Sequence, residues 1–146
     1  MPKRFTLAEA NRMIPHVEPL LKQALALKNE FQEAAQSFQS IGQRVTMMGG
    51  MVLNRDQAID SKHRRDDLGM QLKTLIEKVQ EFGCTIKDLD RGLIDFPTLF
   101  RGTEVCLCWK LGEADIAWWH STEEGFGGRK PIDQDFLDHH RGDRAQ

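Results

Sequence analysis

The fold is decided by the stretch LIDFPTLFRGTEVCLCW, which covers residues 93–109. Apolar and polar residues alternate on both sides of Arg101-Gly102, a pattern typical of two half-buried strands joined by a two-residue turn. We therefore predict strands at Leu93–Phe100 and Thr103–Trp109. Further turn signals on both sides indicate that this hairpin is the centre of a small antiparallel sheet.

The length of the turn predicts the register of the hairpin. With two turn residues, Leu99 faces Glu104 and Asp95 faces Cys108. One face is then apolar and packs on the helices: Ile94, Phe96, Phe100, Val105, Leu107 and Trp109. The other face carries Asp95, Glu104, Cys106 and Cys108.

Two flanking strands are expected, at Cys84–Asp88 and Asp115–His120. We place the turn before the second of them at Gly112-Glu113. In that register Trp119 lies beside Cys106. His120 then lies beside Val105, at the edge of the apolar face.

The chain before residue 84 has the pattern of two helices. Residues 6–9, Thr-Leu-Ala-Glu, form a capping box, and apolar residues follow at steps of three and four as far as residue 41. A second stripe covers Leu68–Phe82. Pro15 and Pro19 interrupt the first stripe and predict a kink or a fresh helix start near Pro15.

The polar segment Gln43–Asp67 fits either a helical extension or a mobile loop, and we favour the helix. The expected fold is α+β, a long helical hairpin packed on a small antiparallel sheet of three or four strands. We expect one domain over residues 1–132 and a loosely ordered C-terminal tail over residues 133–146.

Composition limits the class of protein. A chain of 146 residues with 40% apolar residues can bury one core. A net charge of −2 and a pI near 6.2 argue against nucleic-acid binding. No apolar run reaches the roughly 20 residues of a membrane span, and no signal-peptide pattern opens the chain. The three cysteines are an odd number and cannot all pair in disulfides, which agrees with a reducing compartment. We therefore expect a cytoplasmic protein.

Several short motifs share the pattern of a known family. They are Phe5-Thr6-Leu7-Ala8-Glu9-Ala10-Asn11 with Pro15, the run Lys87–Pro97, Cys108-Trp109 followed by Gly112-Glu113, Trp119-His120, and Gly125-Phe126 with Gly128-Arg129. Together they resemble the bacterial family catalogued as domain of unknown function 2203, over most of residues 5–131 and most strongly from residue 87 onward. The resemblance implies a shared fold and brings no activity with it.

His120 is the strongest candidate for chemistry. It ends a predicted strand close to Asp95 and is followed by Glu123 and Glu124, so these four side chains could hold a divalent first-row metal. The alternative is a histidine whose ring nitrogens bond backbone or carboxylate groups. We favour the alternative, because neither a His-x-His nor a His-Glu-x-x-His spacing is present.

Cys106 and Cys108 point to the same side of their strand, with Cβ atoms roughly 6–7 Å apart. That separation is too wide for an easy disulfide. They could contribute to a metal site, but buried cysteines more often act as small apolar residues. A nucleophilic pair with His120 is disfavoured, because the expected register puts the thiols and the imidazole on opposite faces.

Two further residues are candidates for ligand binding. Trp119 points away from Trp118, so it could wall a pocket or an interface. Arg129, after the glycine-rich stretch 125–128, could present its guanidinium to an anion. A salt bridge from Arg129 to Asp88, Asp90 or Asp95 is the favoured alternative.

Two functions follow as hypotheses. The first is a non-catalytic interaction or regulatory module whose helical hairpin binds itself, as a homodimer, or a protein partner. The apolar stripes exceed what a small sheet can cover, which favours self-association. The second is a metal- or small-ligand-binding domain, with metal-dependent hydrolysis as its chemistry, centred on His120. Because no recognisable catalytic spacing is present, the sequence favours the first and a protein that is not an enzyme.

Overall fold

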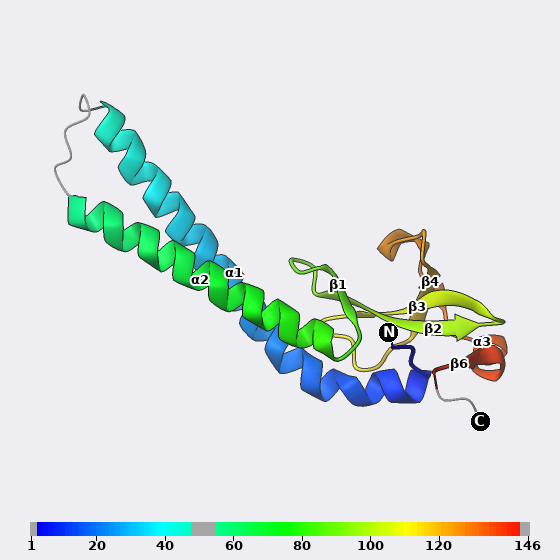
Figure 1. Ribbon diagram of the computed structural model, residues 1–146. Coiled ribbons are helices and arrows are strands. Elements are labelled where there is room, and N and C mark those ends of the chain that lie inside the picture. Colours follow the sequence, from blue (N-terminus) through cyan, green and yellow to red (C-terminus); the bar gives the residue numbers. More distant parts are fainter. Residues whose placement is uncertain (1–2, 48–54, 144–146) are drawn as a thin grey trace. The chain divides into compact units, whose positions relative to one another are not determined.

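The structure is a computed structural model that describes residues 3–47 and 55–143 (Figure 1). Its elements are α1 (Leu7–Met47), α2 (Arg55–Glu81), β1 (Thr85–Asp88), β2 (Leu93–Phe100), β3 (Thr103–Lys110), β4 (Trp118–Ser121), the 3-10 turn η1 (Phe126–Gly128), β5 (Lys130–Pro131), α3 (Gln134–His139) and β6 (His140–Arg141). As predicted, the fold is α+β, with two long helices that form a hairpin and an antiparallel sheet after them.

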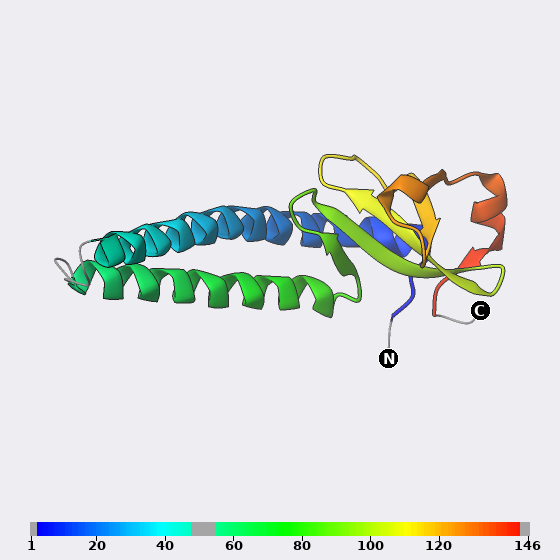
Figure 2. The same ribbon diagram turned by 90° about the horizontal axis from the view of Figure 1, so that it is seen from above.

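The described residues form two compact units. The hairpin unit is Lys22–Leu75, in which α1 and α2 run side by side (Figure 2). The sheet unit comprises the described residues of Met1–Leu21 and Ile76–Gln146. No described helix is long and apolar enough to cross a membrane.

The start of α1 has the predicted capping box. The Thr6 amide donates to Glu9 Oε1 at 2.9 Å, and the Glu9 amide donates to Thr6 Oγ1 at 3.1 Å. Of the two alternatives predicted near Pro15, a kink or a fresh helix start, the fresh start does not occur, since α1 continues through Pro15 and Pro19. The apolar stripe crosses both prolines and is buried in the core of the sheet unit, so packing maintains the helix despite two missing backbone donors.

The polar segment between the two apolar stripes is helical where the structure describes it. Helix α1 extends to Met47 and α2 begins at Arg55, which agrees with the favoured helical extension. The part of that prediction on residues 48–54 lies outside the described residues.

The sheet has six strands, in the order β1-β2-β3-β4-β5, with β6 paired to β2. The first four are the predicted strands, and the two-residue strands β5 and β6 add to them. The β2–β3 register is confirmed, with Asp95 opposite Cys108 and Leu99 opposite Glu104. It follows from the two-residue turn, in which Arg101 and Gly102 have φ of 52° and 81°.

The predicted register of β4 against β3 is wrong by one residue. His120 lies opposite Cys106 and not Val105, and Trp119 lies opposite Leu107 and not Cys106. The connection over residues 111–117 is a loop and not a tight turn. Its Ile116 amide donates to Asn11 Oδ1 of α1 at 2.9 Å, a long-range contact that a local turn pattern does not contain. A shift of one residue moves every side chain of β4 to the other face.

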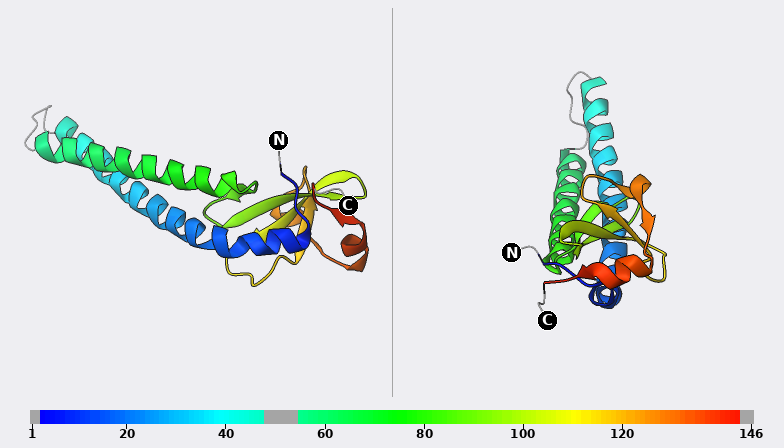
Figure 3. Two further views of the ribbon diagram at one scale, coloured as in Figure 1. Left: turned by 60° about the horizontal axis from the view of Figure 1, so that its bottom comes forward. Right: turned by 90° about the vertical axis from the view of Figure 1, so that its right-hand side faces the viewer.

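Residues 133–143 belong to the segment for which we expected loose order, and in the structure they include α3 and β6. The Asp133 side chain caps α3 by accepting from the Phe136 amide, and the Phe136 side chain is fully buried. Figure 3 shows α3 and β6 beside the start of α1, where the Leu7 amide donates to His140 Nε2 at 3.0 Å. The division into a domain over residues 1–132 and a tail stays a prediction.

Candidate functional site

Three neighbouring strands bring Asp95, Cys106 and His120 together on the polar face of the sheet. One possible metal-binding atom from each residue lies within 4.8 Å of the other two. The side chains belong to β2, β3 and β4, and their residues are 3%, 8% and 2% exposed. The corrected register explains this group, because it moves the imidazole to the face of the carboxylate and the thiol.

The two ring nitrogens of His120 face two oxygen atoms. Nδ1 lies 2.7 Å from the Ser121 carbonyl oxygen, and Nε2 lies 3.0 Å from Asp95 Oδ1. A carbonyl oxygen only accepts, so Nδ1 carries a hydrogen and donates it. In a neutral imidazole Nε2 then carries no hydrogen, and its lone pair faces the Asp95 carboxylate. This contact is stable only with a positive charge between the two atoms, supplied by a proton or a metal ion.

The second oxygen of Asp95 has no comparable hydrogen bond among the described residues. Oδ2 is buried and has no hydrogen-bond partner in the described part of the chain. A buried polar atom without a partner costs roughly 1–3 kcal/mol, and more when it is charged. The carboxylate therefore has capacity for one more electropositive contact.

The thiols of this face are kept protonated. Burial raises the pKa of Cys106 to about 12 and that of Cys108 to about 11, and the negative charge of Asp95 adds to both effects. Because the nucleophile is the thiolate, such thiols are poor nucleophiles at neutral pH. The expected obstacle to a nucleophilic pair with His120 was opposite faces, and that was wrong. The pair is disfavoured because both ring nitrogens are already engaged.

A cavity of about 430 Å³ lies over the same face. Its floor is formed by Asp95, Cys108 and His120. One wall comes from Lys87, Asp88 and Arg91 at the end of β1, with Leu93 of β2, and the other from residues 122–126 after β4. The cavity gives the buried group a route to small molecules.

The two predicted acidic ligands line this cavity but do not join Asp95, Cys106 and His120. Glu123 is exposed. Glu124 accepts from Lys130 Nζ at 2.6 Å and from the Ser121 amide at 3.2 Å, and these bonds lower the pKa of Glu124 to about 2. Its carboxylate is therefore already engaged by a cation and a backbone donor.

Trp119 lies on the opposite face from the group. Its ring is partly buried against the core and packs on Phe100 and Phe136 at centroid distances of 5.2 and 5.1 Å. The expected pocket wall is thus core packing. The one-residue shift puts Trp118 on the polar face in its place, opposite Cys108.

Arg129 is used within the fold. Nη1 and Nη2 donate to the two carboxylate oxygens of Glu113 at 3.0 and 2.7 Å, and Nη2 also donates to the Cys108 carbonyl at 3.2 Å. The guanidinium stacks on Phe126 and Trp118 at 4.6 and 5.4 Å. A salt bridge was the favoured expectation, but its partner is Glu113 and not one of the three aspartates named.

Sequence reasoning missed Cys106 as a companion of His120. The spacing Cys-x-Cys singled the residue out, and the β2–β3 register placed it correctly on the polar face with Asp95. The error was in the predicted position of His120, which lies opposite Cys106 and not Val105.

Comparison with known proteins gives a family. A family model described as "Uncharacterized conserved protein (DUF2203)" matches residues 3–132. Neither the curated proteins nor the solved structures yield a match.

Proposed function

The chain belongs to the DUF2203 family, and from that premise we propose that its sheet unit binds one divalent metal ion through Asp95, Cys106 and His120. The ligand atoms are an Asp95 carboxylate oxygen, Cys106 Sγ and His120 Nε2. The proposal assigns binding and gives no residue a catalytic role. The sequence favoured an interaction module over a metal-binding domain. We now place the metal-binding domain first, because the corrected register brings a carboxylate, a thiol and an imidazole close together.

The observation that carries the proposal is the hydrogen-bond pattern of His120. Metal-binding histidines commonly donate their second ring N–H to a backbone carbonyl or a carboxylate. Here Nδ1 faces the Ser121 carbonyl at 2.7 Å, which leaves Nε2 to act as ligand beside the Asp95 carboxylate. An ion bound there would also satisfy Asp95 Oδ2, which has no partner among the described residues.

Charge and ligand type favour zinc or a similar ion. Binding of the ion would displace the proton of the Cys106 thiol into solvent. A divalent ion, one thiolate, one carboxylate and one neutral imidazole then sum to zero charge, which is the least costly state for a buried site. A set of nitrogen, oxygen and sulfur ligands suits Zn²⁺, whereas Mg²⁺ and Ca²⁺ prefer oxygen alone. The free thiols that such a site needs also support a cytoplasmic location.

The test is the metal content and Zn²⁺ affinity of tag-free, full-length protein purified without chelator. We expect about one equivalent of zinc. We expect His120→Ala and Cys106→Ala to weaken binding at least about 100-fold, since removal of a ligand should exceed the 10- to 100-fold cost of an outer-shell change. His63→Ala is the matched control, because His63 is exposed on α2.

The outcomes separate the metal site from a structural histidine. Absence of zinc from wild-type protein that also fails to bind added Zn²⁺ would refute the proposal, and so would equal affinity in His120→Ala. Circular dichroism checks that each variant is folded. Cys106→Ala serves as the second variant because alanine is small and apolar, as the buried thiol is.

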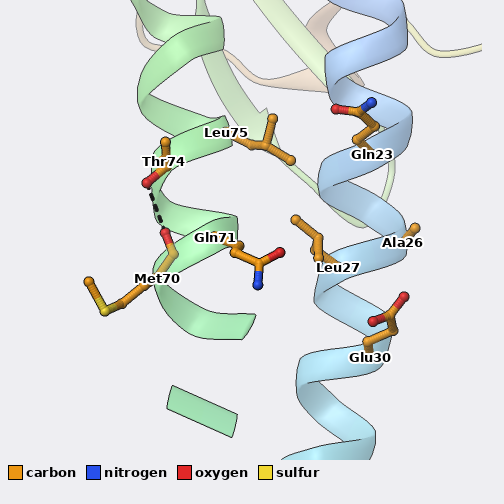
Figure 4. A pocket seen from close by; sticks show the side chains of 8 residues that line it. All are labelled: Gln23, Ala26, Leu27, Glu30, Met70, Gln71, Thr74 and Leu75. Carbon is orange, nitrogen blue, oxygen red and sulfur yellow. Dashed lines mark hydrogen bonds between the residues drawn. The ribbon is translucent and has the colours of Figure 1, made fainter. Parts of the chain in front are cut away.

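A second function, self-association through the hairpin unit as a homodimer, is favoured by a groove between α1 and α2. The groove has a volume of about 600 Å³. Figure 4 shows Leu27 and Leu75 pointing into the space between the helices. Met70, whose backbone carbonyl accepts from the Thr74 hydroxyl, also lines the groove. Met70 is 71% exposed. An apolar groove beside an exposed methionine is typical of surfaces that bind a partner helix.

Sedimentation velocity over a range of protein concentrations tests this function. We expect a dimer that Met70→Glu shifts towards monomer by about tenfold or more in dissociation constant. Lys73→Glu is the control, since Lys73 is exposed on the same helix and does not line the groove. Monomeric wild-type protein at high concentration would exclude the homodimer.

A further inference from the structure

Resting on the proposed metal site, we infer that the cavity over it binds a small carboxylic acid, whose carboxylate contacts the ion and the ammonium group of Lys87. The inference combines an open coordination position, the charge pattern of the cavity walls and the cavity's size.

Three protein ligands leave a coordination position open. Four-coordinate zinc with three protein ligands holds water or a substrate at the fourth position. Asp95 and His120 both line the cavity floor, so the open position faces this space. Cys108 also lies on the floor, but it is not a member of the group within 4.8 Å.

Most charges of the cavity walls are already paired. Arg91 Nε lies 3.7 Å from Asp88 Oδ2, and Lys130 Nζ lies 2.6 Å from Glu124 Oε1. In the described part of the chain no hydrogen bond or ion pair involves Lys87. With a neutral metal site below it, the ammonium group of Lys87 is the positive charge available to a ligand.

Lys87 lines the same cavity as Asp95 and His120. It lies at the irregularity of the β1–β2 pairing between Ile86 and Asp88. The charge of Lys87 also acts on the Cys106 thiol. A single ammonium group and a neutral metal site match one negative charge. That favours a carboxylate over a phosphate dianion, whose second negative charge the nearby Glu123 would repel.

The cavity is small and partly apolar. Its volume of about 430 Å³ is near the lower end of the range of about 300–1,000 Å³ found for small-molecule sites. Leu93 and Phe126 give it an apolar lining beside the charged groups. A short-chain carboxylic acid therefore fits both the charge and the space.

The test uses full-length protein loaded with Co²⁺, whose visible spectrum reports on its ligands. Acetate and butyrate are the probes. We expect both to shift the cobalt absorption bands in a saturable way, with butyrate the tighter binder because of its apolar chain. We expect Lys87→Met to weaken acetate binding about tenfold or more, through loss of a charge-assisted contact, and Lys87→Arg to restore part of it.

The matched control is Lys78→Met. Lys78 is exposed in the last turn of α2 and does not line the cavity, so the same loss of charge should leave acetate binding unchanged. An equal loss in Lys87→Met and Lys78→Met would mean that only net charge matters and would overturn the inference.

The failures of the two proposals are distinguishable. Protein that binds neither Zn²⁺ nor Co²⁺ removes the metal site and this inference with it. Protein that binds Co²⁺ through a thiolate but does not respond to either acid overturns the inference alone. That result is expected if Cys108 moves to close the fourth position, and a second thiolate would strengthen the near-ultraviolet charge-transfer band.

Discussion

The Arg129 side chain is held by an ion pair, a hydrogen bond to a backbone carbonyl and two aromatic rings. Its guanidinium donates to both carboxylate oxygens of Glu113 and to the Cys108 carbonyl, and it stacks on Phe126 and Trp118. Lysine keeps the charge but has neither the planar fork nor the stacking surface. We expect Arg129→Lys to lower the free energy of unfolding by about 1–3 kcal/mol.

Urea denaturation followed by tryptophan fluorescence measures this loss. The control is Arg91→Lys, because Arg91 is 65% exposed along its side chain and contacts Asp88 at 3.7 Å. That substitution should change stability by no more than about 0.5 kcal/mol. Equal effects of the two variants would show that the stacked, bidentate geometry contributes nothing.

Glu113, the partner of Arg129, predicts a pH dependence of stability. Burial alone would raise the pKa of Glu113, but hydrogen bonds from the Arg129 guanidinium and the Lys110 amide, with the charges of both side chains, lower it below the ordinary value of 4.5. A carboxylate with a lowered folded-state pKa adds stability that is complete above the unfolded pKa. That stability is lost as the pH falls through the folded pKa.

We therefore expect Glu113→Gln to be less stable than wild-type protein at about pH 6, with the difference narrowing from about pH 5 downward. Denaturation curves at several pH values measure it. Glu77→Gln, an exposed change on α2, should follow wild-type protein throughout. A constant difference between Glu113→Gln and wild-type protein down to about pH 3 would contradict the ionic role of Glu113.

At the scale of elements, α3 is anchored by one aromatic side chain. Phe136 is fully buried, and its ring stacks on the ring of Phe100 at 4.8 Å and on that of His140 at 5.2 Å. We expect Phe136→Ala to destabilise the protein by about 3–5 kcal/mol, as for other buried aromatic residues. Leu137→Ala is the control, because Leu137 is 41% exposed on the same helix.

Thermal denaturation of both α3 variants checks this prediction. A loss in Phe136→Ala no larger than that in Leu137→Ala would mean that α3 does not pack on the sheet in solution. His140 connects the same segment to the Leu7 amide, so removal of α3 and β6 should also weaken the start of α1.

The strand registers show what the sequence could predict. The β2–β3 register follows from a turn of two residues, whose length leaves one pairing. No such rule applies between β3 and β4, because the loop over residues 111–117 is fixed by long-range contacts such as Ile116 to Asn11. An error of one residue in that register placed His120 on the opposite face of the sheet from Asp95 and Cys106 in the prediction.

The part of the candidate site that the sequence predicts correctly lies on the β2–β3 hairpin, whose register is also predicted correctly. The β2–β3 hairpin placed Asp95 and Cys106 on one face, and the end of β4 singled out His120. Glu123 and Glu124 were chosen for their nearness in sequence to His120. Sequence distance does not show that Glu124 bonds Lys130 and the Ser121 amide, since those contacts depend on the path of the loop.

At the scale of the whole molecule, the two units differ in how much apolar surface they bury. Among the described side chains of the hairpin unit, the buried apolar residues are Ala24, Ala34, Ile41 and Leu68. The sheet unit buries larger side chains, including Trp109, Phe5, Phe96 and Phe136. Because burial of apolar surface is the main stabilising contribution, the hairpin unit should open at a lower free energy than the sheet unit.

Amide hydrogen exchange measured by mass spectrometry tests this difference. We expect peptides from residues 22–44 and 56–75 to exchange at least about tenfold faster than peptides from β2 and β3 in dilute, monomeric protein. Self-association through the hairpin unit would cover its groove and exclude water, so its protection should rise with protein concentration while that of β2 and β3 stays the same. Equal protection of both units in dilute protein would mean that the two long helices are as stable as the sheet. That result would contradict the expectation drawn from their smaller buried apolar surface. Protection of the hairpin unit that does not change with concentration would instead count against the homodimer.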